Sequence, residues 1–152
     1  SFKLFAGLSH EDIRELIANC RKLEAGPGEM VIRQGLEGSE MYIIVAGLLE
    51  VVRETTLDMQ VLAALEPGEV FGELAILDQQ PRSATVRAVS PCILLAFDRS
   101  ALIRIPLVAP KLYRNVALIL SQRLRETNAL LSITLTPKPT NEASARPVMR
   151  KR

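Results

Sequence analysis

The apolar positions of the chain follow two different periods, and the change falls near residue 22. Before that point the apolar residues recur at helical spacing, which predicts an amphipathic helix. Its apolar face would consist of Ile13, Leu16, Ile17 and Cys20. Ser9 stands where its side chain can accept a hydrogen bond from the N–H of Asp12, and Leu8 can pack on Ile13. The sequence therefore predicts that a helix begins just after Ser9.

From residue 22 onward, short apolar runs alternate with turns that contain glycine or proline. The runs cover residues 30–33, 41–45, 48–53, 60–65, 83–89 and 92–98. Evenly spaced short strands of this kind are typical of an all-β jelly roll or barrel. Four glycines fall at the expected corners, where each would supply a positive φ and hold the fold without touching a ligand. They are Gly28, Gly35, Gly38 and Gly47.

The C-terminal part returns to helical spacing. Residues 99–105 predict a short helix, Pro106 and Pro110 interrupt the pattern, and a long helix is expected over about residues 111–133. One stripe of this helix has the 4-3-4-3-4 spacing of a heptad seam: Tyr113, Ala117, Leu120, Leu124, Thr127 and Leu131. A second stripe, Leu112, Val116 and Ile119, can pack on the β-domain. One broad face buried within the same chain is the alternative, but two separable stripes favour a seam between two chains.

The composition of the chain limits the functions that the protein can have. The 152 residues suit one domain plus a helix or tail, and no apolar run approaches the ~18 residues of a membrane span. Five of the 19 basic residues and one of the 17 acidic residues lie in residues 137–152, which leaves a net charge of −2 on residues 1–136. The predicted folded part is therefore not a basic nucleic-acid binder. The tail carries three prolines and little apolar content, which is typical of disorder.

Few residues could hold a metal. His10 is the single histidine, and it falls at a predicted helix terminus, so a histidine-based metal enzyme of the cupin type is excluded by count. No nucleophile–base pair is visible, and the chain is not expected to be an enzyme or to carry a cofactor. Cys20 and Cys92 are expected to be buried free thiols, which fits a reducing cytoplasm.

The segment 71–86, FGELAILDQQPRSATV, carries the candidate chemistry. Gly72 lets the backbone approach a ligand closely, and the N–H groups that open a helix attract phosphate. Eight residues separate the carboxylate of Glu73 from Arg82, whose planar fork of donors matches phosphate oxygens. The plain alternative is a buried helical turn with a Glu73–Arg82 ion pair. An arginine between apolar segments is costly unless it is paired, which favours a ligand site.

The spacing F-G-E-L-A-x-L followed by P-R-S-A-T-V resembles the phosphate-binding cassette of cyclic nucleotide-binding domains. The run from Gly35 to Gly47 is similar to that family's G-x-x-G-x-x-x-Y/F-x-I/V-x-x-G pattern, and the resemblance covers about residues 8–133. It implies a mainly β fold with flanking helices: an eight-stranded antiparallel β-roll with an inserted cassette helix and a long C-terminal helix. It implies a sensor of a cyclic nucleotide, with cyclic AMP favoured over cyclic GMP.

The resemblance also implies roles for single residues. Gly72 would allow the turn, and the N–H groups of Glu73, Leu74 and Ala84 would face the cyclic phosphate. The Glu73 carboxylate would hold the ribose 2′-hydroxyl, Arg82 would pair with a phosphate oxygen, and Ser83 would add a hydrogen bond. Ala75 is a further candidate ligand-binding residue of the cassette. Candidate pocket walls are Val61, Leu62, Val70, Phe71 and Leu74.

The long helix carries the expected contacts to the base. The stretch 123–128, RLRETN, is similar to the R-L-x-x-T-S of catabolite-activator-type dimer helices, with Asn128 in place of the serine. Thr127 of one chain and Asn128 of its partner would lie near each base in a homodimer. Asn carries a donor and an acceptor, so it could meet adenine or tolerate guanine, and Ser83 could also reach a guanine amino group.

These expectations give three regions: a helix plus β-roll over residues 1–107, a dimerisation and lid helix over 108–134, and a disordered basic tail over 135–152. The expected partners are a cyclic nucleotide and a second copy, without a membrane segment. Only residues 134–152 follow the long helix, too few for a helix-turn-helix domain. The chain would thus be a stand-alone sensor, or the sensing fragment of a transcription regulator or gated channel, which could bind a different effector.

Overall fold

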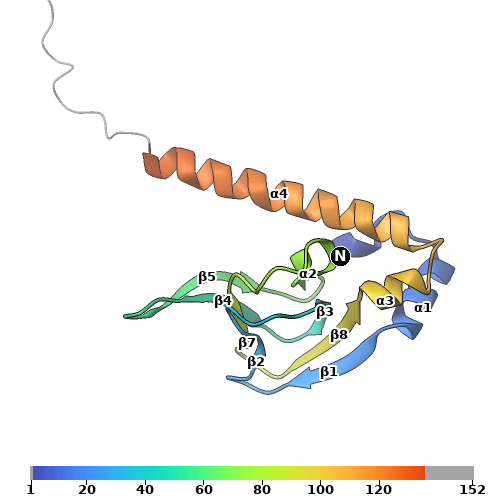
Figure 1. The fold of residues 1–152 in the computed structure, drawn as a ribbon, viewed down its shortest axis with the longest axis horizontal. Helices are drawn as coiled ribbons and strands as arrows, with labels where there is room; N and C mark the ends of the chain where they lie inside the picture. Colours follow the sequence, from blue (N-terminus) through green and yellow to red (C-terminus); the bar gives the residue numbers. More distant parts are fainter. Residues whose placement is uncertain (1, 136–152) are drawn as a thin grey trace, which may run out of the picture. The chain divides into compact units, whose positions relative to one another are not determined.

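The computed structural model describes residues 2–135, and their core is a β-roll of two four-stranded antiparallel sheets. One sheet has the order β1-β8-β3-β6, and the other has the order β2-β7-β4-β5 (Figure 1). The strands are β1 (Arg21–Ala25), β2 (Met30–Ile32), β3 (Glu40–Ala46), β4 (Leu49–Glu54), β5 (Met59–Leu65), β6 (Val70–Phe71), β7 (Thr85–Ala88) and β8 (Cys92–Asp98). The predicted eight-stranded β-roll is confirmed, with six strands close to their predicted bounds.

Side chains from both sheets fill the space between them. Ile44, Leu94, Leu49 and Val86 belong to this cluster, and each is almost fully buried. Leu94 alternates with the less buried Ile93 and Leu95 along β8, as a period of two requires, whereas Ile44 and Val86 each follow a residue that is also buried. The burial of these branched side chains, which transfers apolar surface out of water, holds the frame that carries the candidate site.

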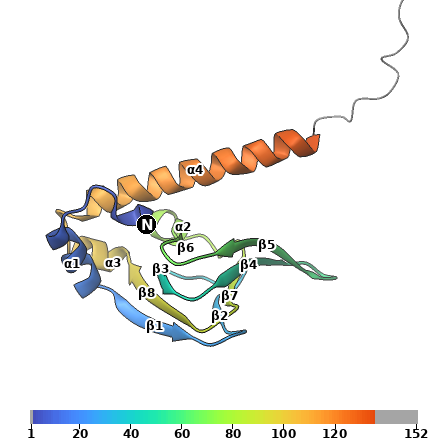
Figure 2. The ribbon, with the colours of Figure 1, turned by 180° about the vertical axis from the view of Figure 1, so that it is seen from behind.

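Helices gather at one end of the β-roll, while the β4–β5 hairpin extends from the other (Figures 1 and 2). They are η1 (Lys3–Phe5), α1 (His10–Ala18) and α3 (Arg99–Ile103), together with the start of α4 (Ala109–Leu135). Asn115 on α4 is 2% exposed, and its amide donates to the carbonyls of Leu4 and Ala6, at 2.7 and 2.8 Å. A buried polar side chain with both donors satisfied fixes the N-terminal segment on α4.

The predicted start of α1 is confirmed, but its predicted apolar face is partly wrong. Ser9 accepts from Asp12 N at 3.1 Å and the Asp12 carboxylate accepts from Ser9 N, which is a capping box. The helix ends at Ala18, because the Asn19 amide donates to the Glu15 carbonyl and closes the last turn. Cys20 therefore lies outside the helix, half-buried, and burial raises the pKa of its thiol to about 12.

The two predicted stripes of the long helix differ in burial as expected. Leu112, Val116 and Ile119 are buried, whereas Leu124 and Leu131 are 60% and 51% exposed. Pro110 lies in the first turn of α4, where its missing N–H breaks no hydrogen bond. The chain divides into two compact units, of which the first ends at Ile119 and the second begins at Leu120. The predicted basic tail lies outside the described residues apart from its first position.

Candidate phosphate-binding site

A glycine turn places the short helix α2 (Leu74–Leu77) between β6 and β7. Gly72 follows β6 and has a φ of +73°, a conformation that glycine adopts without strain. A Cβ at this position would also lie 3.0 Å from Arg82 Nη1 and 3.1 Å from the Glu40 carbonyl oxygen. Gly72 is thus needed for its backbone angle and for the approach of Arg82.

Arg82 is held through both its main chain and its side chain. Its N–H donates to the Leu36 carbonyl at 2.9 Å, and its own carbonyl accepts from Gly35 N at 2.8 Å. Its guanidinium donates from Nη1 to the Gly72 carbonyl at 3.2 Å and from Nη2 to the Glu40 carbonyl at 2.7 Å. Carbonyls hold the group without cancelling its charge, and the fork retains N–H groups for an anion.

The electrostatic surroundings of this guanidinium act in two opposite directions. Burial lowers the pKa of Arg82, whereas the nearby Tyr42, Glu40 and Glu73 act in the opposite direction. A guanidinium remains protonated at neutral pH even after a moderate reduction. A half-buried permanent cation beside a glycine turn is suited to bind a small phosphate.

Glu73 is the second charged residue of the site and is only 6% exposed. It is the residue that immediately precedes α2, with helical φ and ψ of −63° and −27°. Its charge acts on Arg82, so the structure brings together the two groups that the sequence placed nine positions apart. A buried carboxylate costs free energy unless it is compensated, which is typical of a residue kept for binding.

The remaining cassette residues surround this pair. Ser83 is exposed and Ala84 is half-buried, on the segment that leads into β7. Ala75 is 4% exposed, and Leu74 is 48% exposed. Their expected contacts with the phosphate stay predictions.

The predicted pocket walls fall into two groups. Val61 and Leu62 on β5 are 55% and 43% exposed, so their side chains are open to a ligand. Val70 and Phe71 are 1% and 3% exposed, and Phe71 stacks on Tyr42 with ring centroids 4.9 Å apart. These two buried residues could support the wall from beneath, whereas direct contact is open to Val61, Leu62 and Leu74.

Thr127 and Asn128 lie on the exposed distal part of α4. The Thr127 hydroxyl donates to the Arg123 carbonyl one turn earlier, at 2.9 Å. That hydroxyl can rotate toward another acceptor, since such back-bonding within a helix is weak. The roles of both residues at the base stay predictions.

Gly38 and Glu40 are site residues that the sequence reasoning missed. Gly28, Gly35 and Gly47 have the predicted positive φ, but Gly38 does not, so its expected role as a left-handed corner is wrong. A Cβ on Gly38 would lie 2.7 Å from two nitrogens of Arg82. Gly38 stands out in the sequence as part of the run from Gly35 to Gly47, but the sequence does not show that Arg82 lies against it.

The cassette helix is also tied to the helical end of the domain. Arg99, the first residue of α3, donates from Nε and Nη2 to the Ile76 carbonyl of α2, at 3.1 and 2.7 Å. Two charge-assisted hydrogen bonds to one carbonyl make α2 and α3 mechanically dependent on one another.

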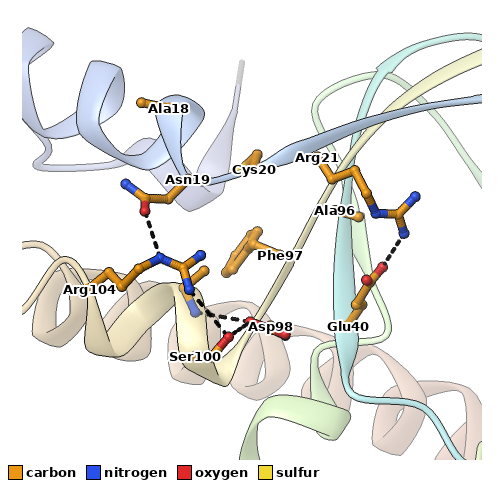
Figure 3. A pocket seen from close by; sticks show the side chains of 11 residues that line it. Ala18, Asn19, Cys20, Arg21, Glu40, Ala96, Phe97, Asp98, Ser100 and Arg104 are labelled. Atoms are coloured by element: carbon orange, nitrogen blue, oxygen red, sulfur yellow. Dashed lines mark hydrogen bonds and ion pairs between the residues drawn. The ribbon is translucent and has the colours of Figure 1, made fainter.

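A polar cleft of about 470 Å³ lies elsewhere, between the end of α1, β8 and α3 (Figure 3). Its two arginines are already engaged: Arg21 pairs with the Glu40 carboxylate at 2.8 Å, and Arg104 donates to Asn19 at 3.1 Å. Glu40 connects the cleft to the cassette, because its carboxylate holds Arg21 and its carbonyl holds Arg82.

Comparison with known proteins agrees with this geometry. The family model of the cyclic nucleotide-binding domain matches residues 22–106, more than half of the chain. The chain belongs to the cyclic nucleotide-binding domain family. Its β-roll is the fold of solved members of that family.

Individual relatives include regulators and one enzyme. The chain is 38% identical over 136 residues to the cyclic AMP receptor protein of Thermus thermophilus, covering 86% of this chain and 61% of that protein. The crystal structure of the Thermus thermophilus catabolite activator protein matches with a TM-score of 0.79 and 31% identity, over 87% of this chain and 62% of that one. The acetyltransferase Pat of Mycolicibacterium smegmatis is 32% identical over 124 residues, 82% of this chain and 37% of that protein.

A ligand-bound structure is also similar. The regulatory domain of Toxoplasma gondii PKA with cAMP matches with a TM-score of 0.61 and 32% identity, over 68% of this chain and 40% of that one. The chain spans less than two thirds of the length of each of these four relatives. No described helix is long and apolar enough to cross a membrane.

Proposed function

We propose that this domain binds cyclic AMP in preference to cyclic GMP, with the phosphate at Gly72, Glu73 and Arg82. The observation that carries the proposal is the fixed guanidinium of Arg82, hydrogen-bonded to the Gly72 carbonyl at the turn that opens α2. The Glu73 carboxylate would accept from the ribose 2′-hydroxyl, and the Leu74 and Ala84 N–H groups and the Ser83 hydroxyl would face the phosphate. The names of the similar receptor and of the cAMP-bound kinase domain support this choice of ligand.

Ligand binding would be relayed to the C-terminal helix. Phosphate held at Gly72 and Glu73 would shift α2, and the bond from Arg99 to the Ile76 carbonyl would transmit that shift to α3 and α4. Ligand can change the helix arrangement only by binding one arrangement more tightly than the other. This relay is a regulatory role, and we propose no catalytic step for the domain.

The exposed stripe of α4 supports a homodimer. Leu124 and Leu131 leave apolar surface exposed at heptad spacing, which a second copy of the helix could bury. In that arrangement Thr127 and Asn128 would close over the base. The alternative is that the domain is the sensing part of a longer cytoplasmic regulator or channel that binds a different effector.

Calorimetric titration of the purified chain with cyclic AMP, cyclic GMP and cyclic di-GMP tests the ligand. Cyclic AMP should bind most tightly of the three. Tighter binding of either guanine ligand would overturn the proposed preference. No heat with any of the three would contradict binding by this site.

A further inference from the structure

We propose that Gly38 is a positioning residue for Arg82, and that the missing side chain at this position keeps the guanidinium placed to bind the cyclic phosphate. The inference rests on the proposed role of Arg82. It adds a residue outside the cassette, 44 positions earlier in the chain, to the phosphate site.

The geometry identifies which part of Arg82 depends on Gly38. A Cβ built on Gly38 would lie 2.7 Å from Nε, 2.7 Å from Nη2 and 3.0 Å from Cζ. Because both nitrogens are closer than the carbon between them, the added atom would lie at the edge of the guanidinium plane. Nη2, at that edge, also donates to the Glu40 carbonyl at 2.7 Å, so the added atom would crowd a nitrogen that fixes the guanidinium.

Gly38 is not required for its backbone angle. Gly28, Gly35 and Gly47 have φ between +82° and +89°, where a side chain is strained, but Gly38 lies outside that region. The atoms that an alanine methyl would meet belong to the far end of a flexible side chain, which can move at low cost. An alanine should therefore leave the fold intact and displace the guanidinium.

Displacement would affect the ligand because the position of Arg82 is prepared before binding. The guanidinium is fixed by the Gly72 and Glu40 carbonyls, at 3.2 and 2.7 Å. A methyl group at the Nε–Nη2 edge would push the guanidinium off these carbonyls. Such a displacement weakens binding, since a shift of about 1 Å in a positioned group can cost up to 100-fold.

Gly26 provides a matched control. It also lacks a positive φ, and a Cβ there would meet no atom within 4 Å. Gly38→Ala and Gly26→Ala thus make the same chemical change and the same change in unfolded-chain entropy. Calorimetry with cyclic AMP should show at least tenfold weaker binding for Gly38→Ala and binding within threefold of the parent for Gly26→Ala. Thermal unfolding should leave both variants within a few degrees of the parent.

A double-mutant cycle with Arg82→Ala shows whether Gly38 acts through the arginine. In the Arg82→Ala background, Gly38→Ala should cause no further loss of affinity. If Gly38→Ala lowers the melting temperature, Arg82→Ala should cancel that loss, because the clashing atoms are gone. If Gly38→Ala still lowers affinity or stability in the Arg82→Ala background, the inference is wrong. The inference is also wrong if Gly38→Ala binds like the parent while Arg82→Ala binds weakly. Parent-like binding by Arg82→Ala itself would instead overturn the proposed phosphate role of Arg82.

Discussion

Replacement of Arg82 by alanine tests the phosphate site most directly. The change removes a half-buried cation and the two hydrogen bonds to the Gly72 and Glu40 carbonyls. A hydrogen bond to a charged group contributes about 1.5–3 kcal/mol, and Arg82 would make at least one to a phosphate oxygen. We therefore expect cyclic AMP affinity to fall by about 2–4 kcal/mol, which is roughly 30- to 1,000-fold.

The effect on folding should be smaller than the effect on binding. The two carbonyls lose their donors, but the site is open to water, so the expected cost is about 1 kcal/mol. For a chain of this size that corresponds to a fall of roughly 2–4 °C in melting temperature. Arg82→Lys, which keeps the charge without the planar fork, should fall between the parent and Arg82→Ala in affinity.

The assay is calorimetric titration with cyclic AMP, beside thermal unfolding of each variant. Arg14→Ala is the control for net charge, because the Arg14 side chain is 77% exposed on α1 and pairs with Glu11 of the same helix. Its affinity should match that of the parent. If Arg82→Ala binds within threefold of the parent while remaining folded, the assignment of the cassette is wrong.

Three further predictions address other parts of the proposal. Glu73→Gln should weaken binding of cyclic AMP far more than binding of its 2′-deoxy analogue in calorimetry; equal losses would remove Glu73 from the ribose role. Arg99→Ala should leave cyclic AMP affinity within about threefold of the parent, because Arg99 contacts the Ile76 carbonyl and not the ligand. The same variant should reduce the ligand-induced change in amide hydrogen exchange along α4. An undiminished change in exchange would contradict the relay. Thr127→Val should lower cyclic AMP affinity by about 1 kcal/mol while light scattering still shows a dimer, since one hydrogen bond is lost and an apolar seam residue is kept. A monomeric parent, or unchanged affinity in that variant, would contradict the lid.

The strands that the sequence predicted are those with enough apolar residues to form a distinct run. Residues 41–45 and 92–98 are such runs, and both belong to the sheet that contains β3 and β8. The strand β1 was missed because Arg21–Ala25 is mostly polar and exposed, and only its pairing with β8 makes it a strand. The strand β6 was missed because it is two residues long.

The candidate site shows the same division between local and distant information. The positive φ of Gly72 and the start of α2 follow from a local turn, so the sequence could indicate them. The contacts of Arg82 with Gly38 and with the Glu40 carbonyl join residues that are 44 and 42 positions apart. Every residue has a main-chain carbonyl, so the sequence does not indicate which carbonyl will accept a hydrogen bond from Arg82. Such a contact is known only from the folded β-roll.

The difference between the arginines near Glu40 explains why one of them is suited to a ligand. Arg21 pairs with the Glu40 carboxylate, so a formal negative charge already offsets its own. Arg82 binds the carbonyl of that same residue, a dipole without formal charge, and a second carbonyl at Gly72. These dipoles restrict the motion of the guanidinium, while the nearby Glu40 and Glu73 also act on its charge. Gly38 lies against the Nε–Nη2 edge of this guanidinium, and the absence of a side chain there lets Arg82 keep its hydrogen bonds to the two carbonyls.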